Sequence, residues 1–106
     1  MLLKYNIDIN DAAIEYNLNR LTNQTYKLLP TWEEAADWKK PLATIIEEFS
    51  GMKELFMNYQ EIFFSLLCKL EGLFIYTEDP TDFLMFRKTV FECLNLIGEL
   101  RRALCH

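Results

Sequence analysis

Apolar residues recur every three to four positions through most of this chain, which is the spacing of one face of an α-helix. The pattern is strongest over residues 52–74, where the apolar stripe spans about 140° at 100° per residue. The chain has six prolines and glycines, and the periodic segments run between them: Pro30, Pro41, Gly51, Gly72, Pro80 and Gly98. The pattern therefore predicts an all-α protein, a four- or five-helix bundle.

The proline and glycine positions set the expected ends of the helices. Pro30 is expected to end the first helix, because the ring of a proline disfavours the helical conformation of the residue before it. Pro41 lacks the amide hydrogen of a helical residue, so the second helix is expected to be kinked or broken there. Gly51 is expected to cap the end of that helix, and Gly72 is a candidate end for the third. The expected helices cover residues 10–29, 31–49, 52–74 and 80–104.

Polar residues supply the expected helix starts. Thr31 followed by Glu34 has the spacing of a capping box, in which each side chain bonds a free backbone amide of the first turn. Asp79 is an expected N-cap, with Pro80 at the first helical position. These signals predict helix starts just after residues 31 and 79.

The first residues follow a different rule. Apolar residues alternate strictly with polar ones from Leu3 to Ile9, which is the period of a half-buried strand. No second strand candidate follows, so residues 1–9 are expected to form an extended arm. Such an arm either lies on the helices or pairs with its copy in another subunit. The alternative is a helix that begins earlier.

Composition bounds the class of protein. With 106 residues, 51% of them hydrophobic, the chain is expected to form a single domain over residues 1–106 with its own core. The net charge of −5 argues against direct binding to nucleic acid, which requires a clustered excess of Lys and Arg. No apolar run approaches the ~20 residues of a membrane span, and the start lacks a signal-peptide pattern. We therefore expect a cytoplasmic protein that binds neither nucleic acid nor membrane.

Residues that could carry catalysis are few. The single histidine, His106, is the last residue, whereas a catalytic pair needs a rigidly held one. Cys68, Cys93 and Cys105 have neither the number nor the spacing of a zinc site, and the first two are expected to be buried reduced thiols. The chain also lacks a glycine-rich phosphate loop. We therefore expect no catalytic residue, no cofactor and no metal.

Some apolar residues fall outside the expected core stripes. Met57, Phe64 and Cys68 share the opposite side of the expected helix 52–74, and Leu84, Phe91 and Gly98 form a second line on the expected helix 80–104. One interpretation is that both helices are central and wrapped on several sides. The other is a surface for oligomerisation or partner binding. The primary contact candidates are Met57, Phe64, Leu84 and Phe91.

Aromatic residues give a second set of contact candidates. Trp32 and Trp38 flank an acidic segment and are expected to be partly exposed. With Tyr16 and Tyr26, which lie off the core stripe of the first helix, they can form a recognition surface, because such aromatics dominate binding hot spots. The alternative is ordinary packing at one end of the bundle.

The acidic residues concentrate in the expected second helix, opposite its apolar side. Carboxylates three or four residues apart can hold a divalent cation in a cleft, as all-helical nucleotide pyrophosphatases do with paired acidic motifs on facing helices. A second alternative is an inhibitor whose carboxylates occupy the basic groove of a nucleic-acid-binding protein. The simplest interpretation is a solvated acidic face, made of Glu33, Glu34, Asp37, Glu47 and Glu48.

Three stretches resemble uncharacterised small helical proteins of bacteriophages and mobile elements in low-GC Gram-positive bacteria. They are LTNQTYKLLP at residues 21–30, LLCKLEGL at 66–73 and FRKTVFECL at 86–94. The resemblance implies an accessory protein that acts by binding a host or phage protein, for example an inhibitor of a bacterial defence system. It transfers no catalytic residue.

Together these observations predict a non-enzymatic protein–protein interaction module. Its expected partners are a second copy of the chain, with a dimer favoured, or another protein. The metal-dependent enzyme and the acidic inhibitor remain the alternatives.

Overall fold

The computed structural model describes residues 11–77 and 79–105, and in these residues it is built of helices alone. The prediction of an all-α bundle is confirmed. The expected extended arm at residues 1–9 lies outside the described residues. The elements are α1 (Asp11–Tyr26), α2 (Leu28–Glu33), α3 (Lys39–Leu55), α4 (Gln60–Gly72), α5 (Phe83–Leu104) and two 3₁₀ turns, η1 (Leu73–Ile75) and η2 (Pro80–Asp82).

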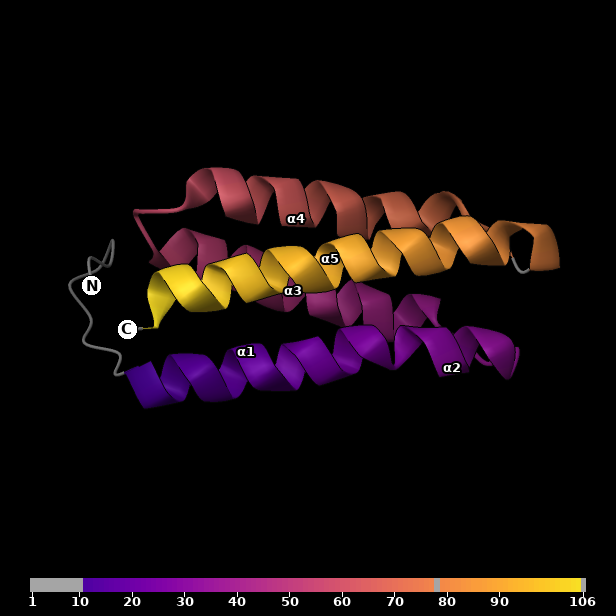
Figure 1. Cartoon of the computed structure of the whole chain (residues 1–106), viewed down its shortest axis with the longest axis horizontal. Helices are drawn as coiled ribbons and strands as arrows, with labels where there is room; N and C mark the ends of the chain where they lie inside the picture. Colours follow the sequence, from indigo (N-terminus) through magenta and orange to yellow (C-terminus); the bar gives the residue numbers. More distant parts are fainter. Residues whose placement is uncertain (1–10, 78, 106) are drawn as a thin grey trace.

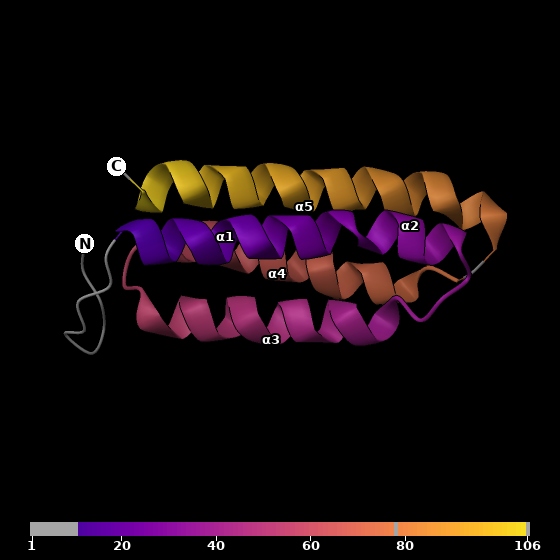
Figure 2. The ribbon, with the colours of Figure 1, turned by 90° about the horizontal axis from the view of Figure 1, so that it is seen from below.

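The four long helices form an antiparallel bundle (Figure 1). The helix α1 packs against α3 and α5, and α4 packs against the same two helices. Short α2 continues the direction of α1 (Figure 2). The chain reverses direction between successive long helices, which gives the up-down-up-down arrangement (Figure 1). The bundle measures 46 × 22 × 20 Å.

The centre of the bundle is a continuous apolar core to which every long helix contributes. Leu18, Leu42, Phe63 and Phe86 are each fully buried, one from each long helix. Thr25 is a buried polar residue of the described part of the chain, and its hydroxyl donates to the Leu21 carbonyl oxygen at 2.8 Å. This bond satisfies the hydroxyl within its own helix, so it adds no unpaired polar group to the core.

An aromatic cluster closes one end of the bundle. The Trp32 ring lies 4.3 Å from that of Phe86 and 5.2 Å from that of Trp38, measured between centroids. Such pairs contribute about 0.5–1.5 kcal/mol each beyond the area they bury. The cluster folds α2 and the following connection onto α5, and leaves Trp32 and Trp38 only 8% and 1% exposed. The expectation that both tryptophans are partly exposed is therefore wrong.

The first helical segment departs from the expected helix 10–29. The helix α1 ends at Tyr26, and after a turn at Lys27 the short α2 continues through Pro30 to Glu33. Pro30 lies in the first turn of α2, where a missing amide hydrogen breaks no bond, so it does not end a helix. Thr31 forms no capping box; its hydroxyl donates to the Lys27 carbonyl oxygen at 2.7 Å.

The expected helix 31–49 is broken, which was one of the two expectations, but the break lies at residues 34–38 and not at Pro41. Ala35 takes a left-handed conformation with φ of 55° at the end of α2. The Asp37 carboxylate then accepts hydrogen bonds from the amides of Lys39 and Lys40 at 3.0 and 3.3 Å, which caps α3. Pro41 therefore lies in the first turn of α3, where it causes no break.

The expected helix 52–74 is two helices in the structure. The helix α3 passes through Gly51, which is not a cap, and ends at Leu55, while α4 begins at Gln60 after a left-handed Tyr59 with φ of 65°. The Gln60 side-chain amide donates to the carbonyl oxygens of Lys53 and Phe56, at 3.0 and 2.6 Å, and so satisfies the free end of α3. Apolar residues on both sides of the break face the core, because α4 packs back on α3.

The last helical segment runs from Pro80 to Leu104, as η2 followed by α5. The Asp79 carboxylate accepts a hydrogen bond from the Thr81 amide at 2.9 Å, which lowers the pKa of Asp79. Gly72 ends α4. Within residues 11–77 and 79–105, no helix combines the length and apolar content needed to cross a membrane.

Candidate functional site

The primary contact candidates are all exposed, but they do not form one surface. Leu84 and Phe91 lie on α5, Phe64 lies on α4, and Met57 lies in the connection between α3 and α4. That connection and the start of α5 are at opposite ends of the bundle (Figure 1). Phe64 therefore lies on one face and Leu84 and Phe91 on another, on neighbouring helices, and Met57 belongs to neither.

We call the first surface the α5 face, made of Tyr26, Leu84, Arg87 and Phe91. Residues 84, 87 and 91 share one side of α5 because they are three and four positions apart. Tyr26, at the end of α1, presents its ring edge-on to Phe91, with 6.3 Å between centroids and an angle of 80°. The Arg87 guanidinium carbon lies 5.0 Å from the centroid of the Phe91 ring, a cation–π contact. Leu84, which is 73% exposed, projects beside this cluster.

The charged side chain of the α5 face is that of Arg87, and further arginines lie at the end of the same helix. Arg87 and Arg102 form no ion pair with a carboxylate in the described part of the chain, whereas Arg101 pairs with Glu15 at 3.3 Å. Arg102 lies over Gly98, its Nη1 atom 3.5 Å from where a Cβ on that glycine would be. The outward side of α5 therefore presents guanidinium groups available to an anionic partner.

We call the second surface the α4 face, made of Glu61, Phe64, Cys68 and Glu71. All four are exposed and spaced three or four positions apart, so they share the outward side of α4. Phe64 is 62% exposed and borders an open hollow of about 530 Å³. The hollow is also lined by Lys53, Gln60, Glu61 and Ser65. This face therefore combines an exposed aromatic ring with carboxylates.

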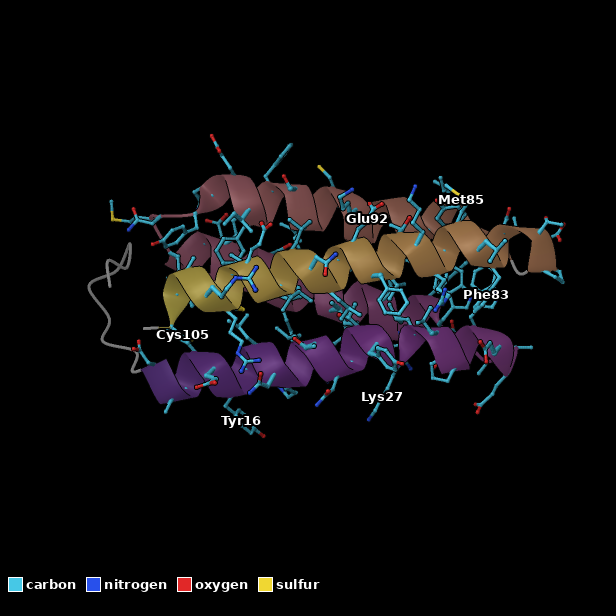
Figure 3. All side chains as sticks on the ribbon, viewed as in Figure 1. Tyr16, Lys27, Phe83, Met85, Glu92 and Cys105 are labelled. Atoms are coloured by element: carbon cyan, nitrogen blue, oxygen red, sulfur yellow. The ribbon has the colours of Figure 1, made fainter. Side chains whose placement is uncertain are left out.

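An ion pair joins α4 to α5 along the seam between the two faces. The Lys69 ammonium donates to the Glu92 carboxylate at 2.6 Å. That hydrogen bond lowers the pKa of Glu92 and raises the pKa of Lys69. Figure 3 shows Glu92 on the side of α5 that faces α4. The pair holds the two helices in register, although half-exposed pairs of this kind stabilise only weakly.

The cysteines lie in three different environments. Cys93 is buried, as expected, and burial raises its pKa to about 12, so its thiol is neutral. Cys68 is exposed, which contradicts its expected burial, because it lies on the outward side of α4. Cys105 is partly buried, and burial followed by the nearby carboxylates of Glu15 and Asp11 raises its pKa.

The five carboxylates of the expected acidic face are distributed over three segments. Asp37 caps α3, and Glu48 pairs with Arg20 at 2.9 Å. Among the residues the structure describes, no three His, Cys, Asp or Glu side chains gather closely enough to hold a metal ion. The helix break at 34–38 thus removes the common face expected from the sequence. Glu33 ends α2, Glu34 and Asp37 lie in the connection, and Glu47 and Glu48 lie on α3.

Sequence reasoning missed part of the exposed surface. Arg87 lies four residues before Phe91, a spacing that places the two side by side on a helix, so this contact had a readable signal. Ile75, in η1, and Met85, in the first turn of α5, are 76% and 51% exposed near the connection between α4 and α5, and neither was singled out. Tyr16 projects away from the bundle on α1, apart from both faces (Figure 3).

Both faces can make contacts typical of protein interfaces. Exposed aromatic rings supply buried area on association, and arginine or carboxylate groups around them supply specificity. Comparison with models of known protein families, with curated protein sequences and with solved structures finds no match.

Proposed function

We propose that this protein is a non-enzymatic protein-binding module that uses the α5 and α4 faces. The observation that carries the proposal is the exposed cluster of Tyr26, Arg87 and Phe91. Tyrosine and arginine are enriched in binding hot spots. Their contacts with Phe91 already restrict the three side chains, so less conformational entropy is lost when a partner binds.

The area available on the faces supports the same proposal. Full burial of an exposed Phe or Leu side chain contributes about 1.5–3 kcal/mol. Phe64 and Leu84 are 62% and 73% exposed and make most of this contribution only when another molecule covers them. These side chains therefore stabilise a complex with a partner more than they stabilise the chain alone.

We propose further that the module is an accessory protein of a bacteriophage or mobile element that binds a host protein, for example as an inhibitor of a defence system. The support is the resemblance of three stretches of the chain. Two of these stretches carry members of the α5 face: residues 21–30 contain Tyr26, and residues 86–94 contain Arg87 and Phe91. The third, residues 66–73, contains Cys68 and Glu71 of the α4 face.

Two substitutions test the proposed binding role. Phe64→Glu and Phe91→Glu each place a charge in one face, and both are expected to preserve helicity by circular dichroism. In capture of partners from a lysate of a low-GC Gram-positive bacterium, each variant is expected to lose partners that the wild-type protein retains. Tyr16→Glu is the matched control, because it changes an exposed aromatic residue outside both faces.

The outcomes separate the explanations. Loss of fold in both Phe variants would show that these residues belong to the core and would refute the binding role. Retention of every partner by both folded variants would also refute it. Loss of partners in the Tyr16 control as well would show that added charge, not the faces, determines capture.

A further inference from the structure

We infer that a second copy of this chain occupies these faces, with the α5 face of one copy docked on the α4 face of the next. This inference rests on the proposed function of the two faces as binding surfaces. It adds a further partner, another copy of the chain, and the geometry of that contact.

Charge complementarity selects this pairing. The α5 face is apolar and basic, with Arg87 beside Phe91 and no carboxylate paired to that guanidinium in the described residues. The α4 face is apolar and acidic, with Glu61 and Glu71 on either side of Phe64 and Cys68 along the helix. Two α5 faces would bring like charges together, and so would two α4 faces, whereas one of each places opposite charges around apolar centres.

The two faces also differ in relief. The α4 face has the hollow of about 530 Å³ beside Phe64, which is open to solvent. On the α5 face, Leu84 projects with 73% of its surface exposed. The hollow has room for an aliphatic or aromatic side chain. Glu61 and Lys53 both line the hollow. With Leu84 inserted, Arg87 three residues further along the helix is placed against the Glu61 carboxylate, on the side away from Lys53.

The contact is heterologous, because each copy contributes a different face. A heterologous contact leaves one unused face at each end, so it repeats until a ring closes or a chain of copies grows. A copy with one damaged face still has the other intact. Two copies damaged on different faces can therefore form one contact, and only one.

A mixing experiment tests this geometry by light scattering. The wild-type mass is expected to rise above the chain mass of 12.6 kDa with concentration and to fall again with added salt. Phe64→Glu and Phe91→Glu are each expected to remain at 12.6 kDa alone. An equimolar mixture of the two is expected to give a complex of twice that mass, since the intact α5 face of one fits the intact α4 face of the other.

Charge reversal provides a second pair of variants if a Phe substitution unfolds the chain. Arg87→Glu and Glu61→Lys each place like charges across the contact and are expected to be monomeric alone. Their mixture restores an opposite-charge pair and is expected to associate. Both positions are exposed, so the fold is expected to tolerate the changes.

Three results would overturn the inference. They are a wild-type mass of 12.6 kDa at every concentration, a face variant that self-associates as well as wild type, and mixtures that stay monomeric. A monomeric wild-type protein would leave the proposed function standing, because the lysate capture measures a foreign partner independently. If the chain self-associates but the lysate capture yields no partner that depends on the faces, the foreign partner alone would be refuted.

Discussion

Two consecutive phenylalanines on α4 offer a direct test of which side of that helix faces the core. Phe63 is 0% exposed and stacks on Phe56, with 6.1 Å between ring centroids. Phe64 is 62% exposed. The same substitution at the two positions therefore removes the same atoms from opposite environments.

The two alanine substitutions are expected to lower the free energy of unfolding by very different amounts. Phe63→Ala removes a fully buried ring and leaves a cavity, which costs about 3–5 kcal/mol. Phe64→Ala removes a mostly exposed ring, and surface changes of this kind alter stability by about 0.5 kcal/mol or less. Since the free energy of unfolding of a small domain is about 5–15 kcal/mol, the Phe63 variant loses a large share of its stability.

Urea unfolding followed by circular dichroism measures both values, at a protein concentration low enough to avoid association. A Phe64→Ala variant that loses as much stability as Phe63→Ala would place Phe64 in the core. That result would refute the assignment of the α4 face and, with it, the binding role argued from that face.

Three further predictions test other parts of the structure. Asp37→Ala removes the cap of α3 and is expected to lower the free energy of unfolding by about 1 kcal/mol in urea titration; no change would refute the cap. Iodoacetamide is expected to modify the exposed Cys68 in the native protein and the buried Cys93 only on unfolding, because burial raises the Cys93 pKa to about 12. Mass spectrometry of peptides shows which of the two cysteines is modified. Since Lys69 lowers the Glu92 pKa, the stability that Glu92 contributes is present above its ordinary value of 4.5 and is lost as the pH falls below it. Glu92→Gln is therefore expected to be less stable than wild type at pH 7 and equal to it near pH 3, and an equal deficit at both pH values would contradict the pair.

The helical class and most of the core followed from the apolar period, but the helix ends did not. The chain breaks at Ala35 and Tyr59, which take left-handed conformations without being glycine. Local sequence gives no sign of such breaks, because the packing of the helices on either side of each break stabilises them. Conversely, Pro30 and Pro41 lie in first turns, where proline is harmless, so their value as stop signals depended on where each helix began.

The exposed faces were partly readable for the same reason. Helical spacing correctly placed Phe64 and Phe91 away from the core, since each lies within a continuous helix. It failed for Trp32 and Trp38, whose burial depends on how α2 and its connection fold onto α5. The contact between Tyr26 and Phe91 joins residues far apart in sequence, and only the antiparallel packing of α1 and α5 brings them together.

Photo-cross-linking from single positions tests the central claim most directly. A photoreactive phenylalanine analogue is introduced at Phe64, at Leu84 or, as the control, at Tyr16, and the protein is irradiated both alone and in lysate. The account predicts covalent protein adducts from the positions of Phe64 and Leu84 and far fewer from that of Tyr16. Equal yields from all three positions, or adducts from the Tyr16 position alone, would contradict the account.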